Sequence, residues 1–355
     1  MNTAKLNSVG LIALCLAALT ACGGGGGGSG LSPSTNMVGI TVDDATVPTK
    51  LYVSDFGLSV VKSVDIATGV STILAGKSGS PGATNNAIGT LASFYGVEGL
   101  SLFGTNLYAV DAFNCGIRNI STTPPYAVTT LAGSLGVACG NADTAAGVTP
   151  TFNIPRNVAQ DRVTGDIYVA EDSVNNSIRK ITPAGVVTTI VTGLVSPWGI
   201  TSDNASPPVL YITNQTGNSI KKVAFVAGAW SVSTFAGSVG GVSGATNDNG
   251  VLARFNSPLG ITIDDTFTNL YVVDNANNSI RKITIAAPQT VTTIAGTNPV
   301  AAGAADNATG TLATFNTPTS IAYGGGNLYV TDQGGKAIRV ISTTAPNAVT
   351  TKTLN

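Results

Sequence analysis

A five-residue pattern that recurs six times constrains this chain more than any other feature. The clearest copies are residues 270–274 and 328–332, both of the form Leu-Tyr-Val-x-Asp. The same apolar-Tyr-apolar pattern recurs at residues 51–55, 107–111, 167–171 and 210–214. Successive tyrosines lie between 43 and 60 residues apart. A repeat of this period is typical of β-propellers and argues against a single β-sandwich.

The segments around each copy are also strand-like. A Gly-Ile-Thr segment such as residues 260–263 precedes it, an apolar-basic segment such as 280–283 follows it, and a Thr-rich segment such as 291–296 ends the unit. Four short β-rich runs per unit, with no helical periodicity between them, predict a four-stranded antiparallel blade. The sequence therefore predicts an all-β domain over residues 36–355, a six-bladed β-propeller. The chain begins on an inner strand and ends on an outer one, so blades one and six should close the ring by packing alone.

Taken together, these units resemble NHL-repeat β-propellers. The resemblance rests on the forms Phe-x-x-Pro-x-Gly-Ile, Leu-Tyr-Val-x-Asp, Ile-Arg-Lys and Val-x-Thr-x-Ala-Gly, and it covers almost all of residues 36–355. The opening is present at residues 255–260 and 315–318, lacks its proline at 94–97, and keeps Pro197-Trp198-Gly199 without the phenylalanine in blade four. The resemblance implies a six-bladed propeller that acts as a non-catalytic binding or scaffold module.

The N-terminal segment, residues 1–21, has the features of an export signal. Lys5 precedes a nearly unbroken apolar stretch that is too short to span a bilayer comfortably. The residues Leu19-Thr20-Ala21-Cys22 resemble a bacterial lipobox, which implies cleavage before Cys22 and lipidation of that cysteine. Two or more acyl chains would give a stable membrane anchor. The alternative is a conventional cleaved signal with an incidental cysteine.

A glycine-rich tether follows, over residues 22–35. It contains six consecutive glycines, from Gly23 to Gly28, and cannot form a core. Such a flexible coil has a root-mean-square reach of about 20 Å. The lipobox resemblance implies sorting to the outer membrane, because Gly23 and not Asp follows Cys22. We therefore expect a lipid-anchored protein of the bacterial cell envelope, on either side of that membrane.

The composition excludes several classes of function. The chain has no histidine, which removes Ser-His-Asp and Cys-His catalytic groups and every imidazole metal site. The absence of histidine also excludes an enzyme that resembles the amidating-lyase propellers, because their zinc site needs histidines. The formal net charge of −1 argues against nucleic acid as a partner, since phosphate binding needs clustered Lys and Arg.

An acidic residue ends five of the six copies, and a basic residue follows the next turn in all six. The acids are Asp55, Asp111, Glu171, Asp274 and Asp332, with Asn214 in the remaining copy, and the bases are Lys62, Arg118, Arg179, Lys221, Arg281 and Arg339. This pattern predicts one ion pair per blade that clamps a hairpin, weaker at Asn214. A ring of carboxylates that binds a cation is the alternative.

Strand direction indicates which face has the long loops. The hairpin after the second strand and the connector after the fourth emerge on the same face, which we call the connector face. Four connectors are long, at residues 77–90, 134–150, 238–250 and 297–310, whereas the one between blades three and four is almost absent. The two cysteines of the propeller domain, Cys115 and Cys139, should both lie on this face. We expect them to form a disulfide, with two free buried thiols as the alternative.

One position of the repeat, at the start of the innermost strand, differs from blade to blade. The residues at this position should surround the channel mouth on the connector face. The position holds Glu98, Arg156, Trp198, Leu259 and Thr319 in blades two to six, and Asn157 and Ser320 replace the glycine that follows in other blades. We expect a site for a small polar or peptide-like ligand here, with Arg156 for an anion or carbonyl, Glu98 for a donor and Trp198 for stacking. The alternative is that Glu98 and Arg156 merely pair and Trp198 plugs the channel.

Two functional classes remain for this sequence. The first is a non-catalytic envelope module that binds a protein, peptide or glycan and needs no cofactor. The second resembles the calcium-dependent lactonase and esterase propellers. Only Glu98 and Asn157 could begin a calcium site, because Gly199 and Gly260 supply no ligand where further oxygens are wanted. The sequence therefore predicts no metal site and no catalytic residue.

Overall fold

The computed structural model describes residues 36–136, 139–145, 149–172, 174–203, 205–297 and 302–354. The expected signal segment, residues 1–21, and the expected tether, residues 22–35 with Cys22, lie outside these residues. Within the described part of the chain, no helix has the length and apolar character that a membrane crossing requires.

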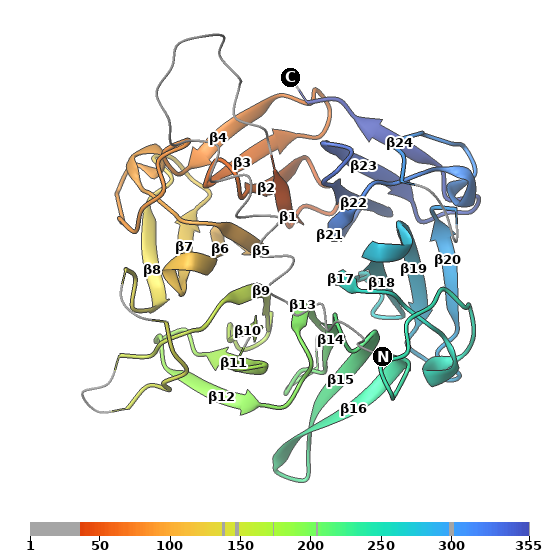
Figure 1. Ribbon diagram of the computed structural model, residues 1–355. Coiled ribbons are helices and arrows are strands. Elements are labelled where there is room, and N and C mark those ends of the chain that lie inside the picture. The colour runs from red at the N-terminus through yellow and green to blue at the C-terminus, as the bar shows by residue number, and fades with distance from the viewer. Residues whose placement is uncertain are drawn as a thin grey trace, which may run out of the picture. The chain divides into compact units, whose positions relative to one another are not determined.

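Six four-stranded antiparallel sheets follow one another around a common axis, which confirms the predicted six-bladed β-propeller (Figure 1). Blade one consists of β1 (Met37–Val42), β2 (Lys50–Asp55), β3 (Val60–Asp65) and β4 (Ser71–Ala75). Blade two consists of β5 (Val97–Phe103), β6 (Asn106–Asp111), β7 (Gly116–Ser121) and β8 (Val128–Gly133), and blade three of β9 (Pro155–Gln160), β10 (Ile167–Glu171), β11 (Ser177–Ile181) and β12 (Val187–Val191).

The remaining blades repeat this order. Blade four consists of β13 (Pro197–Ser202), β14 (Leu210–Asn214), β15 (Ser219–Val226) and β16 (Ala229–Gly237), and blade five of β17 (Pro258–Ile263), β18 (Asn269–Asp274), β19 (Ser279–Thr284) and β20 (Val291–Ala295). Blade six consists of β21 (Pro318–Gly324), β22 (Asn327–Asp332), β23 (Ala337–Ser342) and β24 (Val349–Lys352). Short 3-10 turns, such as η3 (Ala112–Asn114) and η5 (Asn275–Asn277), lie in the hairpins and connectors.

The hydrophobic cores lie between neighbouring blades. The second strand of each blade has buried apolar residues on both of its faces. The six repeat tyrosines, which lie on these strands, are at most 9% exposed. Tyr52 of blade one, for example, packs in one cluster with Phe94 and Leu100 of blade two. A buried aromatic ring removes about 150–250 Å² from water, so each tyrosine joins its blade to the next.

Blades six and one close the ring without a shared strand, as the sequence predicted. Ala322 and Tyr329 of blade six pack with Met37 and Ile40 of blade one. A hydroxyl also joins the two blades, because Thr331 Oγ1 donates to the Val38 carbonyl at 3.2 Å. The equivalent hydroxyls join blade one to two, through Ser54 Oγ to Glu98 O at 2.6 Å, and blade four to five, through Thr213 Oγ1 to Leu259 O at 2.5 Å.

The predicted clamp is present, and it extends further than one ion pair. Arg281 Nη1 lies 2.8 Å from Asp274 Oδ2 and also donates to Arg254 O at 2.9 Å. Its Nη2 donates to Thr246 O and Asn247 Oδ1, both in the connector from blade four. The guanidinium lies over the Phe255 ring at 5.1 Å. Arg118, Arg179 and Arg339 repeat this arrangement, and all four arginines are 0% exposed.

Arginine and lysine divide between the blades according to the connectors. The four arginines are in blades two, three, five and six, which the long connectors precede. Lys62 and Lys221 are in blades one and four, which no long connector precedes. Lys62 pairs with Asp55 at 2.7 Å, and Lys221 donates to Thr234 Oγ1 at 2.9 Å, which agrees with the weaker clamp expected at Asn214. A planar fork of donors holds a connector in a way that one ammonium does not.

Replacing one of these arginines should therefore destabilise the fold. We expect Arg281→Lys to lower the free energy of unfolding by about 3 kcal/mol, because one ammonium cannot replace the donors that Arg281 gives to the carbonyls of Arg254 and Thr246 and to Asn247 Oδ1. Urea unfolding followed by intrinsic fluorescence measures this. Arg162→Lys is the matched control, since that side chain is 54% exposed, and it should change stability little. Equal effects of the two substitutions would contradict the clamp.

Cys115 and Cys139 form a disulfide, with their Cα atoms 5.5 Å apart. Cys115 lies at the end of η3, in the hairpin of blade two, and Cys139 lies in the connector toward blade three. The bond therefore attaches a long connector to the blade that precedes it.

Removing this crosslink should lower stability without changing the fold. For a sequence separation of 24 residues, the chain-entropy model gives a loss of about 3 kcal/mol in the Cys115→Ser/Cys139→Ser double variant. Thermal unfolding of the double variant and of the reduced wild type should coincide. A reductant that leaves the wild-type transition unchanged would exclude a stabilising bond.

Candidate functional site

The structure brings Glu98, Arg156 and Trp198 together from three neighbouring blades. Arg156 Nη1 lies 2.7 Å from Glu98 Oε1, and its Nη2 lies 3.1 Å from Asp172 Oδ2. The guanidinium stacks over the Trp198 ring, 4.3 Å from the centroid. Arg156 is thus paired with Glu98, as in the alternative to an anion site, and also with Asp172, which was not predicted.

Burial makes this ionic cluster electrostatically unusual. Glu98 and Asp172 are each 3% exposed and Arg156 is 7% exposed. Within the described residues, Glu98 Oε2 and Asp172 Oδ1 have no hydrogen-bond partner. Burial raises the pKa of Glu98 to about 7, and the nearby Arg156 guanidinium only partly opposes the shift. The cluster therefore has an excess of negative charge that one proton on Glu98 would neutralise.

The other expected site residues lie apart from this cluster. Thr319 Oγ1 shares a hydrogen bond with Thr331 Oγ1 at 2.8 Å, so it belongs to the junction between blades six and one. Asn157 and Ser320, in contrast, line a pocket in the central channel. The six candidate residues therefore separate into an ionic cluster, one structural contact and two pocket residues.

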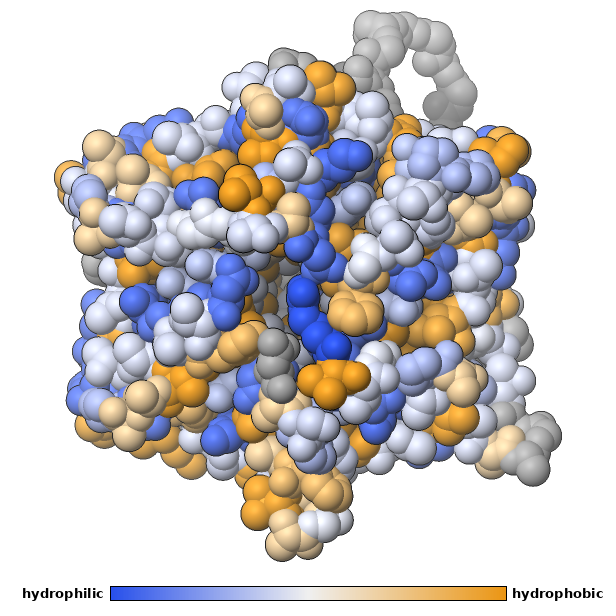
Figure 2. Space-filling view, turned by 180° about the vertical axis from the view of Figure 1, so that it is seen from behind, coloured by the Kyte–Doolittle hydropathy of each residue, from blue (hydrophilic) through white to orange (hydrophobic). Residues whose placement is uncertain are grey.

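The pocket has a volume of about 340 Å³ and is lined by residues of all six innermost strands. Its lining also includes Arg162, Asp264, Asp265 and Phe267, which follow the innermost strands β9 and β17. It therefore lies toward the face opposite to the connectors, whereas we expected the site on the connector face. Figure 2 views the molecule from behind Figure 1 and shows strongly hydrophilic residues gathered along the middle of that face.

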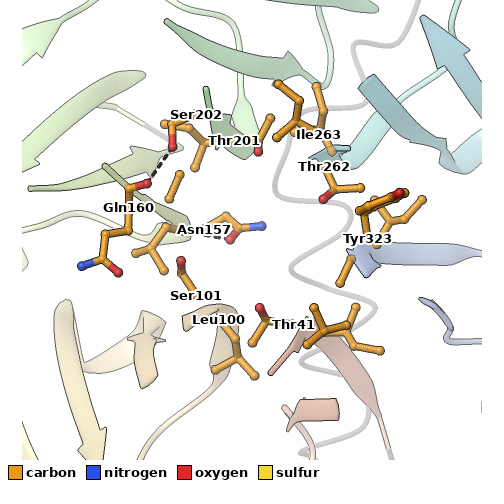
Figure 3. A pocket seen from close by; sticks show the side chains of 18 of the residues that line it. Thr41, Leu100, Ser101, Asn157, Gln160, Thr201, Ser202, Thr262, Ile263 and Tyr323 are labelled. Atoms are coloured by element: carbon orange, nitrogen blue, oxygen red, sulfur yellow. Dashed lines mark hydrogen bonds between the residues drawn. The ribbon is translucent and has the colours of Figure 1, made fainter. Parts of the chain in front are cut away.

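Hydroxyl groups surround the pocket at one level of the innermost strands. The third residue of the Gly-Ile-Thr segment is Thr41, Ser101, Thr201 and Thr262 in blades one, two, four and five. Figure 3 shows these four side chains arranged around the centre of the channel. None of the four hydroxyls has a hydrogen-bond partner among the side chains and backbone that the structure describes. They are thus available to a ligand.

Blades three and six differ from the other four. Ala159 and Ala322 occupy the hydroxyl position there, and both line the pocket. Two residues earlier, Asn157 and Ser320 replace a glycine. Two residues along a strand span about 6.6 Å, so the amide and this hydroxyl form a second, deeper polar level. Asn157 Oδ1 accepts from Val158 N at 2.8 Å, which leaves its Nδ2 free to donate.

The charged residues of the pocket are confined to its rim. Arg162 lies 3.0 Å from Asp44 of blade one in an exposed ion pair. Burial would raise the pKa of Asp264, but hydrogen bonds from Asn269 and Thr268 outweigh it and lower the pKa below its usual range. Among the described pocket residues, the deeper wall contains only apolar, hydroxyl and amide side chains. The pocket interior is therefore neutral and polar.

The wall repeats with a pseudo-twofold arrangement, because blades one to three match blades four to six. Thr41, Ser101 and Ala159 correspond to Thr201, Thr262 and Ala322, and the clamp bases Lys62, Arg118 and Arg179 correspond to Lys221, Arg281 and Arg339. The ionic cluster does not follow this correspondence. The positions of Glu98, Arg156 and Asp172 are occupied by Leu259, Thr319 and Gln333 in the other half of the ring.

Sequence reasoning missed Asp172 and the four hydroxyl residues. Asp172 directly follows the acid of the repeat, a position that is Phe56, Ala112, Gln215, Asn275 or Gln333 elsewhere. The hydroxyls were visible in the sequence as the third residue of each Gly-Ile-Thr segment. The alternation of strand side chains could have indicated that this residue and the glycine two before it share a face.

No cluster of three or more metal-ligating side chains is found in the part of the chain that the structure describes. The two residues that could begin a calcium site are also engaged: Glu98 pairs with Arg156, and Asn157 Oδ1 accepts from a backbone N–H. Of these groups only Glu98 Oε2 has no partner among the described residues, whereas calcium takes six to eight oxygen ligands.

Comparison with known proteins supports the fold. No family model matches the chain, and no curated protein does. A Bacteroides thetaiotaomicron protein of unknown function has a TM-score of 0.66 at 20% identity, over 92% of this chain and 73% of that one. An auxiliary nutrient binding protein from Bacteroides ovatus has a TM-score of 0.66 at 18% identity, over 90% and 70%.

A further similar structure is an enzyme. Virginiamycin B lyase from Staphylococcus aureus has a TM-score of 0.52 at 18% identity, over 89% of this chain and 84% of that one. A histidine-to-alanine variant of that lyase is catalytically inactive. The present chain contains no histidine. At these identities the likeness shows the propeller fold alone.

The raised pKa of Glu98 predicts a pH dependence of stability. The folded protein holds a proton on Glu98 up to about pH 7, whereas an unfolded glutamate releases it near pH 4.3. The free energy of unfolding should therefore fall as the pH rises through this interval. Glu98→Gln removes this contribution and keeps a neutral acceptor for Arg156.

Urea unfolding of wild type and Glu98→Gln at pH 5 and pH 8 tests this. Other titrating groups are common to the two proteins, so the difference between them isolates Glu98. We expect the variant to lose less stability than wild type between the two pH values. A parallel decline in both would show that Glu98 is ionised throughout.

Proposed function

We propose that the protein is a lipid-anchored envelope protein whose NHL-type propeller is a non-catalytic binding module, with the ligand site in the channel pocket. The observation that supports this most directly is the set of partnerless hydroxyls of Thr41, Ser101, Thr201 and Thr262 around a neutral pocket of about 340 Å³. Binding pockets of this size usually hold small ligands through a few convergent polar groups. The nutrient binding protein among the similar structures is consistent with such a role.

The composition of the pocket favours binding over catalysis. Its wall offers hydroxyl and amide groups, and the chain has no histidine to activate them as nucleophiles. The paired state of Glu98 and Asn157 gives the calcium-dependent lactonase alternative no support. We therefore propose no catalytic residue and no cofactor.

The proposed anchor places this module at the membrane. The lipobox-like residues Leu19-Thr20-Ala21-Cys22 support lipidation of Cys22, and Gly23 supports sorting to the outer membrane. A tether with a reach of about 20 Å would keep the propeller near the bilayer while it turns freely. A glycan or peptide of the envelope is then within reach as a ligand.

The anchor and the binding site can be tested separately. Cys22→Ser should abolish incorporation of labelled palmitate.

Thr262→Trp should fill the channel and abolish retention of small molecules from an envelope extract, measured by native mass spectrometry of the purified propeller. Thr188→Val, which removes an exposed hydroxyl on the outer strand β12, should retain the same molecules as wild type. Retention unchanged in Thr262→Trp would exclude the channel as the binding site.

A further inference from the structure

The polar groups of the channel wall are distributed unevenly around its axis. Two neighbouring hydroxyls, Thr41 and Ser101, come from blades one and two, and two others, Thr201 and Thr262, come from blades four and five. Ala159 and Ala322 separate these pairs in blades three and six. In a six-bladed ring, blades three apart lie on opposite sides of the axis. The wall therefore has two opposed hydroxyl arcs and two opposed apolar strips.

The apolar strips differ from the rest of the wall at the alanines. Val158 and Ile321 lie next to them, but the corresponding Ile40, Leu100, Ile200 and Ile261 line the pocket in the other blades too. Ala159 and Ala322 are only 7% and 6% exposed, so their methyl groups are held in place by the cores of the flanking blades. The deeper level adds Asn157 below Ala159 and Ser320 below Ala322. A ligand between the strips would thus meet polar groups at its edges and at its inner end.

We infer that the pocket selects a neutral pyranose sugar whose hydroxyls are equatorial. Such a ring has two apolar faces formed by C–H groups and a polar edge formed by hydroxyls. Its faces match the strips of Ala159 and Ala322, and its edge matches the arcs of Thr41 and Ser101 on one side and Thr201 and Thr262 on the other. This inference rests on the proposed binding function of the same pocket.

The chemistry of the wall also excludes competing ligands. Threonine and serine hydroxyls both donate and accept, which suits sugar hydroxyls that do the same. A charged ligand would lose its hydration in an interior that offers no opposite charge. A dipeptide has charged termini and would meet the same obstacle. An open-chain polyol has the hydroxyls but no flat apolar faces to place against the alanine strips.

Calorimetric titration of the purified propeller with five probes tests the inference. The probes are glucose, cellobiose, sorbitol, glucuronate and diglycine. We expect glucose or cellobiose to bind at least tenfold more tightly than sorbitol, glucuronate and diglycine. Sorbitol binding as tightly as glucose would overturn the role of the apolar strips. Absence of binding by both sugars would overturn the inference altogether.

Substitutions in the wall test the hydroxyl arcs and the apolar strips separately. Thr201→Val keeps the shape and removes one hydroxyl, so sugar affinity should fall about fivefold, which corresponds to one neutral hydrogen bond. Ala322→Ser adds a hydroxyl to an apolar strip and should weaken glucose binding, whereas a merely hydrophilic wall would bind it more tightly. Thr188→Val on β12 is the matched control and should leave affinity unchanged.

The outcome is independent of the test for the binding module. If the envelope extract yields a molecule whose retention Thr262→Trp abolishes, but no sugar binds, the module stands and the pyranose assignment fails. If neither sugar nor extract component binds, both fail.

Discussion

The buried arginine clamp is the interaction on which the rest of the structure depends. Each of the four arginines joins the acid of its own blade to the connector that arrives from the previous blade. Desolvating a guanidinium is costly, and the acceptors around Nη1 and Nη2 of each arginine offset that cost, although each Nε has no partner among the described residues. Connector and blade therefore order one another. The innermost strands, held at a fixed spacing by these blades, can then expose unpaired hydroxyls to the channel.

The repeat made most of the fold predictable from the sequence. A tyrosine every 43 to 60 residues, with strand-like segments on either side, leaves few architectures other than a six-bladed propeller. The acid and base of each clamp were predictable because a hairpin brings them together locally. The sequence did not explain why four blades use arginine and two use lysine. That difference depends on connectors that fold over the blade and contact an arginine far along the chain.

The site was predictable only in part. Aligning the blades brought Glu98, Arg156 and Trp198 together correctly, but Asp172 was missed because its role follows from a side chain that reaches Arg156 in three dimensions. The expected position followed the long loops, whereas the pocket depends on the size of the channel side chains. Arg156 and Trp198 are bulky near the connector face, and Thr41, Ser101 and Ala159 are small toward the other face.

The correspondence of blades one to three with blades four to six has a consequence for the origin of the ring. Two identical three-blade halves, joined head to tail, would already form a closed circle with a twofold axis along the channel. A ligand could then bind in either of two equivalent orientations. The unmatched Glu98, Arg156 and Asp172 lie in one half only, so they give the present ring a direction that a symmetric ancestor would lack.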